Sequence, residues 1–183
     1  MVNLNGGGQR SGALPVLRVV PGGTAEVVLQ SKAVAWVDTH WQDRLLWCAG
    51  EGCELCRLQR SRPRVYAIAT VAKDGRAIPV LLELPAVSWR RCIDEAGLED
   101  SAPLRGCVVR ISRSRAKGPL LVEWLPQVGT LLPGLEDPMR IMEACAVLQS
   151  YPLPQTGETF ETYVERLTPT VRALASRAAS RKE

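Results

Sequence analysis

The residues best suited to chemistry are one histidine and three cysteines that fall within the single stretch HWQDRLLWCAGEGCELC at positions 40–56. They are His40, Cys48, Cys53 and Cys56. Two cysteines separated by two residues form a tight turn that directs both sulfurs at one ion, and Gly50 and Gly52 let the preceding backbone fold closely. One imidazole and three thiolates complete a tetrahedral ligand set. The spacing therefore predicts a closed, structural Zn²⁺ site.

Two other interpretations of this cluster have to be weighed. The cysteines could be core residues, with His40 a surface side chain. A zinc deaminase would carry glutamate two residues after the histidine as its proton shuttle, but Gln42 stands there. Because the chain has one histidine, committing it to a metal leaves no histidine base for a nucleophile. We therefore expect a protein that is not an enzyme.

Composition is that of a water-soluble globular protein. The 183 residues are 46% apolar and 23% charged, and no apolar run approaches the ~20 residues that a membrane helix needs. The first residues lack the basic start and apolar stretch of a signal peptide. We therefore expect a cytoplasmic protein without membrane contact, in which six cysteines do not indicate disulfides.

The elements that would position the metal ligands are mainly short strands. Residues 25–37 are typical of a long or broken strand, and the Asp-Gly turn at 74–75 predicts a hairpin between 65–71 and 77–84. Helical spacing follows at 86–96, ended by Gly97. A second hairpin is expected from 105–114 and 120–125.

This order predicts a mainly β fold, a five-stranded Greek-key barrel of the OB type with an inserted zinc loop, because a helix separates its third and fourth strands. The expected parts are a flexible tail (1–12), the OB-fold domain (13–126) with the zinc loop (40–56), a linker (127–135) and C-terminal helices (136–183). Asp137-Pro138 should start the first of these helices, and Pro169 should kink or restart the last, with Thr168 as cap. We expect these helices to pack on the barrel or on a partner.

Positive charge is concentrated in one segment. Residues 57–117 hold thirteen Lys and Arg against six Asp and Glu, which indicates an anionic partner. Single-strand binders combine such a surface with aromatic faces on which bases stack. The phosphate-binding candidates are Arg60, Arg62, Arg64, Arg105, Arg110, Arg113, Arg115 and Lys117, and the stacking candidates are Trp36, Trp41 and Tyr66. Each could instead belong to an ordinary solvated face or to the core.

The metal loop, with RVYAIATV (64–71) and LRGCVVRISR (104–113), resembles the zinc-containing single-stranded DNA-binding (helix-destabilising) proteins of tailed phages and their bacterial relatives. The similarity covers residues 25–126, and the metal loop is its most specific element. It implies an OB fold, a structural zinc ion and single-stranded DNA as ligand.

The sequence thus predicts a zinc-stabilised protein that binds single-stranded DNA with little sequence preference, in replication, recombination or repair. Two alternatives stay open. One is an RNA-binding protein of the same fold, and the other is a zinc-stapled module whose C-terminal helices bind a protein partner or a second copy of the chain.

Overall fold

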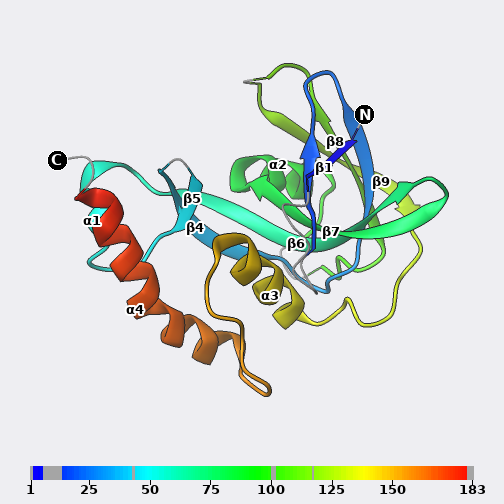
Figure 1. Ribbon diagram of the computed structural model, residues 1–183. Coiled ribbons are helices and arrows are strands. Elements are labelled where there is room, and N and C mark those ends of the chain that lie inside the picture. Colours follow the sequence, from blue (N-terminus) through cyan, green and yellow to red (C-terminus); the bar gives the residue numbers. More distant parts are fainter. Residues whose placement is uncertain (1, 6–13, 43, 100–101, 117, 181–183) are drawn as a thin grey trace.

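The computed structural model in Figure 1 describes residues 2–5, 14–42, 44–99, 102–116 and 118–180. Within them the strands are β1 (Val2–Asn5), β2 (Val16–Val19), β3 (Thr24–Leu29), β4 (Ala35–Gln42), β5 (Arg44–Trp47), β6 (Arg62–Lys73), β7 (Arg76–Pro85), β8 (Cys107–Arg113) and β9 (Leu120–Val128). The helices are α1 (Glu54–Leu58), α2 (Ala86–Glu95), α3 (Pro138–Gln149) and α4 (Phe160–Ala179).

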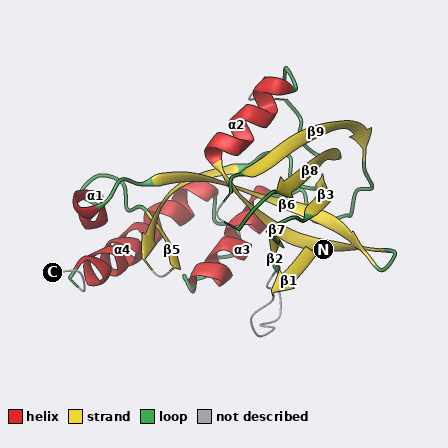
Figure 2. Ribbon diagram, turned by 90° about the horizontal axis from the view of Figure 1, so that it is seen from above, coloured by secondary structure: helices red, strands yellow, loops and turns green. Residues whose placement is uncertain are grey.

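Strand β6 is the centre of the fold because both of its faces are buried. Val65 and Ala67 point into a core cluster that includes α2, whereas Tyr66 and Ile68 point into a second cluster with α3 and α4. A strand covered on both sides reads as a continuous apolar run, which accounts for the sequence of residues 65–71. The molecule therefore has three layers, with α2 on one side of the sheet and α3 and α4 on the other (Figure 2).

Both expected hairpins and the helix between them are confirmed. Strand β6 pairs antiparallel with β7 around Asp74 and Gly75, whose φ angles of 51° and 73° are those of a tight hairpin turn. Strand β8 pairs antiparallel with β9, and α2 is followed by Gly97 at φ 63°. The broken strand expected at 25–37 is also found, because β3 ends at Leu29 and β4 begins at Ala35.

The predicted closed five-stranded OB barrel is wrong. The strands instead form one open, mixed sheet in the order β1-β2-β7-β6-β3-β8-β9, with β4 paired to β6 and β5 paired to β4. Closure would require β9 to return to the other end of the sheet. The outer edge of β7 is taken by β2, which pairs with it in parallel at Val16 and Leu81, so β9 is left at the end of the sheet.

The N-terminal segment was expected to be a flexible tail over 1–12. Residues 2–5 form β1, which pairs antiparallel with β2, and residues 6–12 lie outside the described part of the chain. The missed strand β2 is short, and at Pro15 a carbonyl accepts a hydrogen bond from the Leu81 N–H. Four residues give too little alternation to be distinguished from an irregular segment, so only the pairing with β7 reveals the strand.

The C-terminal helices share a core with the sheet. As expected, α3 begins after Asp137, whose carboxylate accepts a hydrogen bond from the Met139 N–H (2.9 Å). Of the kink or restart expected at Pro169, the restart is excluded, because α4 is continuous from Phe160 to Ala179 and Thr168 donates to the Val164 carbonyl instead of capping a new helix. Within the described residues, no helix combines the length and apolarity needed to cross a membrane.

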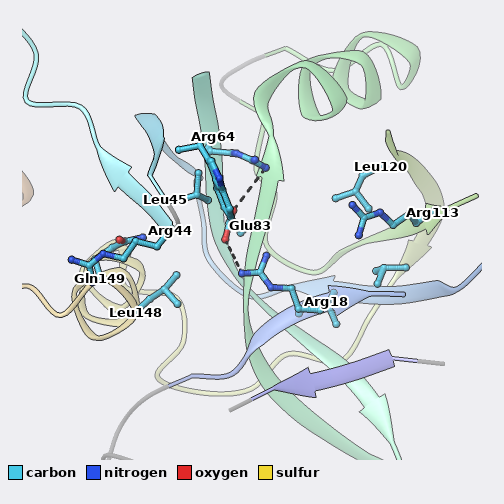
Figure 3. A pocket seen from close by; sticks show the side chains of 12 residues that line it. Arg18, Arg44, Leu45, Arg64, Glu83, Arg113, Leu120, Leu148 and Gln149 are labelled. Carbon is cyan, nitrogen blue, oxygen red and sulfur yellow. Dashed lines mark ion pairs between the residues drawn. The ribbon is translucent and has the colours of Figure 1, made fainter. Parts of the chain in front are cut away.

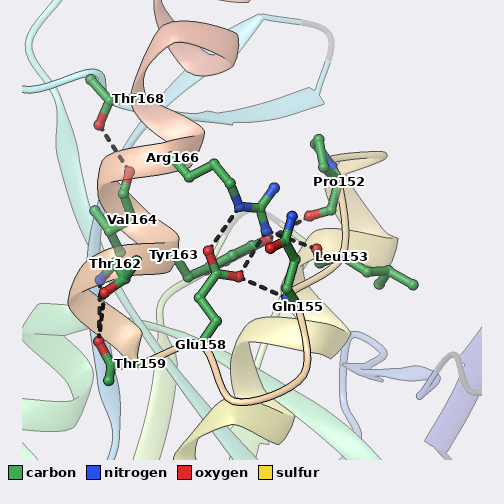
Figure 4. A network of polar contacts seen from close by, with 10 residues as sticks. All are labelled: Pro152, Leu153, Gln155, Glu158, Thr159, Thr162, Tyr163, Val164, Arg166 and Thr168. Carbon is green, nitrogen blue, oxygen red and sulfur yellow. Dashed lines mark hydrogen bonds and ion pairs between the residues drawn. The ribbon is translucent and has the colours of Figure 1, made fainter.

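An ion pair joins the α3–α4 connection to α4 (Figure 4). Both carboxylate oxygens of Glu158 accept hydrogen bonds from the Arg166 guanidinium at 2.8 Å, and one also accepts the Gln155 N–H. These hydrogen bonds from Arg166 lower the pKa of Glu158 to about 2. The same guanidinium donates to the Leu153 carbonyl and lies over the Tyr163 ring. The pair therefore anchors the connection to the first half of α4.

We predict that Glu158→Gln lowers the urea midpoint of unfolding at pH 7, and that its difference from the wild-type protein shrinks as pH falls. A carboxyl whose pKa is depressed on folding stabilises the folded state above its ordinary value of about 4.3. That contribution is lost as pH falls through about 2. Glu165→Gln, an exposed change on the same helix, is the matched control. A Glu158→Gln difference that is equal at every pH would contradict the prediction.

Candidate metal centre and basic groove

The four expected metal ligands converge at one end of the sheet. His40 lies on β4, Cys48 follows β5, and Cys53 and Cys56 flank the start of α1. Gly50 and Gly52 have φ angles of 73° and 75°, a conformation that favours glycine, and they turn the chain from β5 into the Cys-x-x-Cys segment. The Cys53 N–H donates to the Gly50 carbonyl and closes that turn.

The distances between the ligand atoms fit a tetrahedral ion. His40 Nε2 lies 3.6 Å from Cys53 Sγ and 3.5 Å from Cys56 Sγ, and the sulfurs of Cys48 and Cys56 are 3.5 Å apart. All four ligand atoms lie within 4.8 Å of one another. Zinc with bonds of about 2.3 Å to sulfur and about 2.0 Å to nitrogen places its ligand atoms about 3.5–3.8 Å apart. The cluster could therefore hold a metal ion such as zinc.

Protonation in the cluster is consistent with metal binding. Burial lowers the pKa of His40, which keeps the imidazole neutral and its Nε2 available as a ligand. Burial raises the pKa of Cys48 to about 12. Burial acts in the same direction on Cys53, but backbone N–H groups outweigh it and lower the pKa of that thiol. Thiols this close cannot all ionise without a cation between them, so the arrangement favours a divalent metal.

The metal-binding segment also supports the C-terminal helix. Leu46, Cys53 and Leu55 form a small core cluster with Ala175 and Ala179 of α4. At its edge the Arg172 guanidinium donates to the Glu51 carbonyl at 3.3 Å. The second half of α4 is therefore packed on the residues that surround the ligands, as the neighbouring positions of α1 and α4 in Figure 1 show.

A basic groove of about 430 Å³ lies beside the metal centre (Figure 3). Its charged and aromatic lining residues, which define the arginine groove, are Arg18, Arg44, Arg64, Arg113, Glu83 and Trp41. Arg44 lies at one end beside Gln149 and Arg113 at the other beside Leu120. Four guanidiniums against one carboxylate make the groove strongly positive, so it attracts anions.

Glu83 holds two of these arginines in place. Its carboxylate lies 3.5 Å from Arg18 and 3.8 Å from Arg64, which approach it from two sides (Figure 3). The Glu83 side chain is only 3% exposed, whereas that of Arg18 is 53% exposed. The buried carboxylate therefore orients the guanidiniums, while Arg18 keeps donors directed at solvent.

The metal centre and the groove meet on the β4–β5 hairpin. Trp41, which is 61% exposed, follows the ligand His40 directly, and Arg44 faces Gln42 across the turn. A metal ion bound at His40, on β4, and at Cys48, which follows β5, would hold the two strands of this hairpin together. The groove's aromatic residue and one of its arginines are therefore positioned by the metal-binding segment.

The structure brings together three of the residues proposed from sequence for nucleic-acid binding, namely Trp41, Arg64 and Arg113. Trp36 lies in a different cavity. Tyr66 is fully buried, so its ring offers no face to a ligand. Arg60, Arg62 and Arg115 are exposed outside the groove, and Lys117 lies outside the described residues.

Two other candidate arginines are neutralised by carboxylates from distant segments. Arg110 pairs with Glu26 at 2.8 Å and with Glu123 at 3.1 Å. Arg105 pairs with Glu136 at 3.4 Å. Their charges are therefore less available to an anionic ligand than those of the groove arginines.

Sequence reasoning missed Arg18, Arg44 and Glu83. Arg18 alternates with the buried Leu17 and Val19 on β2, which is a usable signal once that strand is recognised. Arg44 stood inside the stretch assigned to the zinc loop. Glu83 is a single acidic residue inside an apolar strand, and such a residue indicates a buried ion pair.

No protein-family model, curated protein or solved structure matches this chain.

We predict that the protein binds one metal ion per chain and that Cys53→Ser weakens this binding and lowers stability. Structural zinc contributes on the order of 10 kcal/mol to small metal-stabilised folds. Metal analysis after gel filtration and a Co²⁺ titration, in which thiolate ligands give near-ultraviolet charge-transfer bands, would measure this. Cys92→Ser, at a buried cysteine outside the cluster, should keep the metal. Equal metal content in the wild-type protein and Cys53→Ser would contradict the assignment.

Chelation should also loosen the second half of α4. Trypsin should then cleave after Arg172 and Arg177 faster than in the metal-loaded protein, because their helix rests on the metal-binding segment. Cleavage after Arg166, which is held by Glu158, is the internal control.

Proposed function

We propose that this protein binds single-stranded DNA with little sequence preference, through the arginine groove, and that a structural Zn²⁺ ion at His40, Cys48, Cys53 and Cys56 stabilises it. Its role is binding and not catalysis, in replication, recombination or repair. The observation that carries the proposal is that Arg18, Arg44, Arg64 and Arg113 line one groove together with the exposed Trp41.

Charge supports a nucleic-acid backbone as the ligand. The arginines are distributed along the groove from Arg44 to Arg113 and are not gathered at one point (Figure 3). Such a track suits successive phosphates of an extended strand better than one compact anion. Guanidiniums that contact phosphates position the strand without reading its bases, which agrees with low sequence preference.

The aromatic residue supports a single strand over a duplex. Trp41 exposes more of its surface than any other large apolar residue of the groove wall, and like Arg44 it lies on the β4–β5 hairpin. An unpaired base can stack on such a ring, at about 1–3 kcal/mol per base, whereas bases inside a duplex are already stacked. The similarity of the metal loop to zinc-containing single-stranded DNA-binding proteins points to the same ligand class.

Zinc is the metal that best suits the ligand set. Three thiolates with one imidazole are typical of structural zinc sites, and four protein ligands leave no position for a substrate. Zinc bound there would supply structural stability to the β4–β5 hairpin. Trp41 and Arg44 would in turn hold the strand through stacking and charge.

Fluorescence anisotropy of a labelled single-stranded DNA oligomer, titrated with zinc-loaded protein at several salt concentrations, tests the proposal. Binding should weaken with salt at a log–log slope of about −0.7 per neutralised phosphate. Arg44→Gln and Arg113→Gln should each reduce that slope, and Trp41→Ala should weaken binding by about 1–3 kcal/mol.

Arg140→Gln is the matched control, because Arg140 lies on α3 in an ion pair with Glu143. Competition with RNA and duplex DNA of the same sequence measures the preference among nucleic acids. Absence of binding at low salt, or groove variants that bind like Arg140→Gln, would refute the proposal.

A further inference from the structure

A second exposed tryptophan lies in a cavity of its own. Trp36 is 42% exposed, and the Arg90 guanidinium sits over its ring, 5.1 Å from the ring centroid. Among the described residues Arg90 forms no ion pair, whereas its neighbour Arg91 pairs with Glu95 at 2.7 Å. The Arg90 charge therefore rests on an aromatic face and stays available to an anion.

The cavity around this pair is large enough for a small ligand and is net positive. It measures about 310 Å³, at the low end of the range for small-molecule pockets. Its residues, which define the Trp36 crevice, include Lys32, Trp36, Trp89, Arg90 and Glu99. Its charged residues are two cations and one carboxylate, and the exposed indole of Trp36 supplies an apolar face, beneath which the indole of Trp89 is buried. Such a cavity suits a flat ring that carries a negative charge.

The Trp36 crevice is separate from the arginine groove. Trp36 and Trp41 are five positions apart on β4, so their side chains point to opposite faces of the strand. Trp36 faces the side of the sheet covered by α2, and the two cavities have no lining residue in common. A ligand in one cavity therefore leaves the other free.

We propose that the Trp36 crevice is a second position for the same single strand, in which one nucleobase stacks on Trp36 while Arg90 and Lys32 contact its phosphates. The proposal rests on the function proposed for the arginine groove. The base takes the face now covered by the guanidinium, and the displaced guanidinium moves to the phosphate. A strand long enough to occupy both cavities gains a second stacking contact.

A nucleotide fits the crevice better than the other occupants of similar size. A lone anion would leave the indole of Trp36 unused. An aromatic peptide side chain would fill the indole face but would leave two cations unpaired. A ligand that joins a ring to an anionic group, as a nucleotide does, satisfies both halves of the site.

The experiment uses full-length, zinc-loaded protein labelled with 5-fluorotryptophan and observed by fluorine NMR. The probe is an oligothymidylate of about 16 nucleotides, the upper end of typical single-strand site sizes. Trp36→Phe and Trp41→Phe assign the two exposed signals. Both should shift during the titration, while the signal of the buried Trp47, which lines neither cavity, serves as the reference for a change in the fold.

Affinity measurements supply a second readout. Trp36→Ala should weaken binding of the 16-mer by about 5- to 150-fold, and Arg90→Gln by about 2- to 5-fold. Arg91→Gln is the matched control, since Arg91 is the adjacent residue on the same helix.

The outcomes separate the two proposals. A Trp41 signal that shifts while the Trp36 signal stays in place would overturn the second position and keep the function of the arginine groove. Equal affinity of Trp36→Ala and the wild-type protein for the 16-mer would do the same. If neither signal moves at low salt, the proposed function itself is refuted.

Discussion

The arrangement of one end of this molecule depends on four side chains, whose metal-ligand atoms lie within 4.8 Å of one another. They are His40, Cys48, Cys53 and Cys56. Together they tie a strand, the end of a hairpin and a short helix to a single point. Burial raises the pKa of Cys48, and without an ion nothing balances the charge of neighbouring thiolates. The ligand Cys53, with Leu46 and Leu55, also packs against α4, so the metal-binding segment joins the hairpin to the C-terminal helix.

The open sheet creates the groove next to this constraint. Because β2 occupies the outer edge of β7, its Arg18 is brought to within 3.5 Å of the buried Glu83. The β4–β5 hairpin, attached to the sheet only through β4, supplies Trp41 and Arg44 from the other side. The groove thus combines residues from β2, β6, β7, β8 and the β4–β5 hairpin, which no single hairpin could bring together.

Electrostatic pairing decides which cations are available. Residues 57–117 have a large excess of positive charge, but Arg105 and Arg110 are paired with Glu26, Glu123 and Glu136, all of which lie outside that segment. Charge counted along the chain therefore overstates the free charge of the folded protein. Arg105 and Arg110 together face three glutamates, whereas the four arginines of the groove face only one glutamate, so more of their charge is available to a ligand.

The sequence by itself determined the local features of this protein. A Cys-x-x-Cys turn with preceding glycines, an Asp-Gly hairpin and the Asp-Pro start of α3 are set by conformational preferences of a few neighbouring residues, so they were predicted correctly. Tertiary structure alone decided the rest. The barrel did not close because β2, too short for its alternation to be read, pairs with β7. Residues of α2 line the cavity that holds Trp36 and residues of α3 line the groove that holds Trp41, and Tyr66 was buried by helices more than seventy residues away in the chain. These outcomes depend on contacts between segments that are far apart in the sequence, and short-range residue patterns do not specify such contacts.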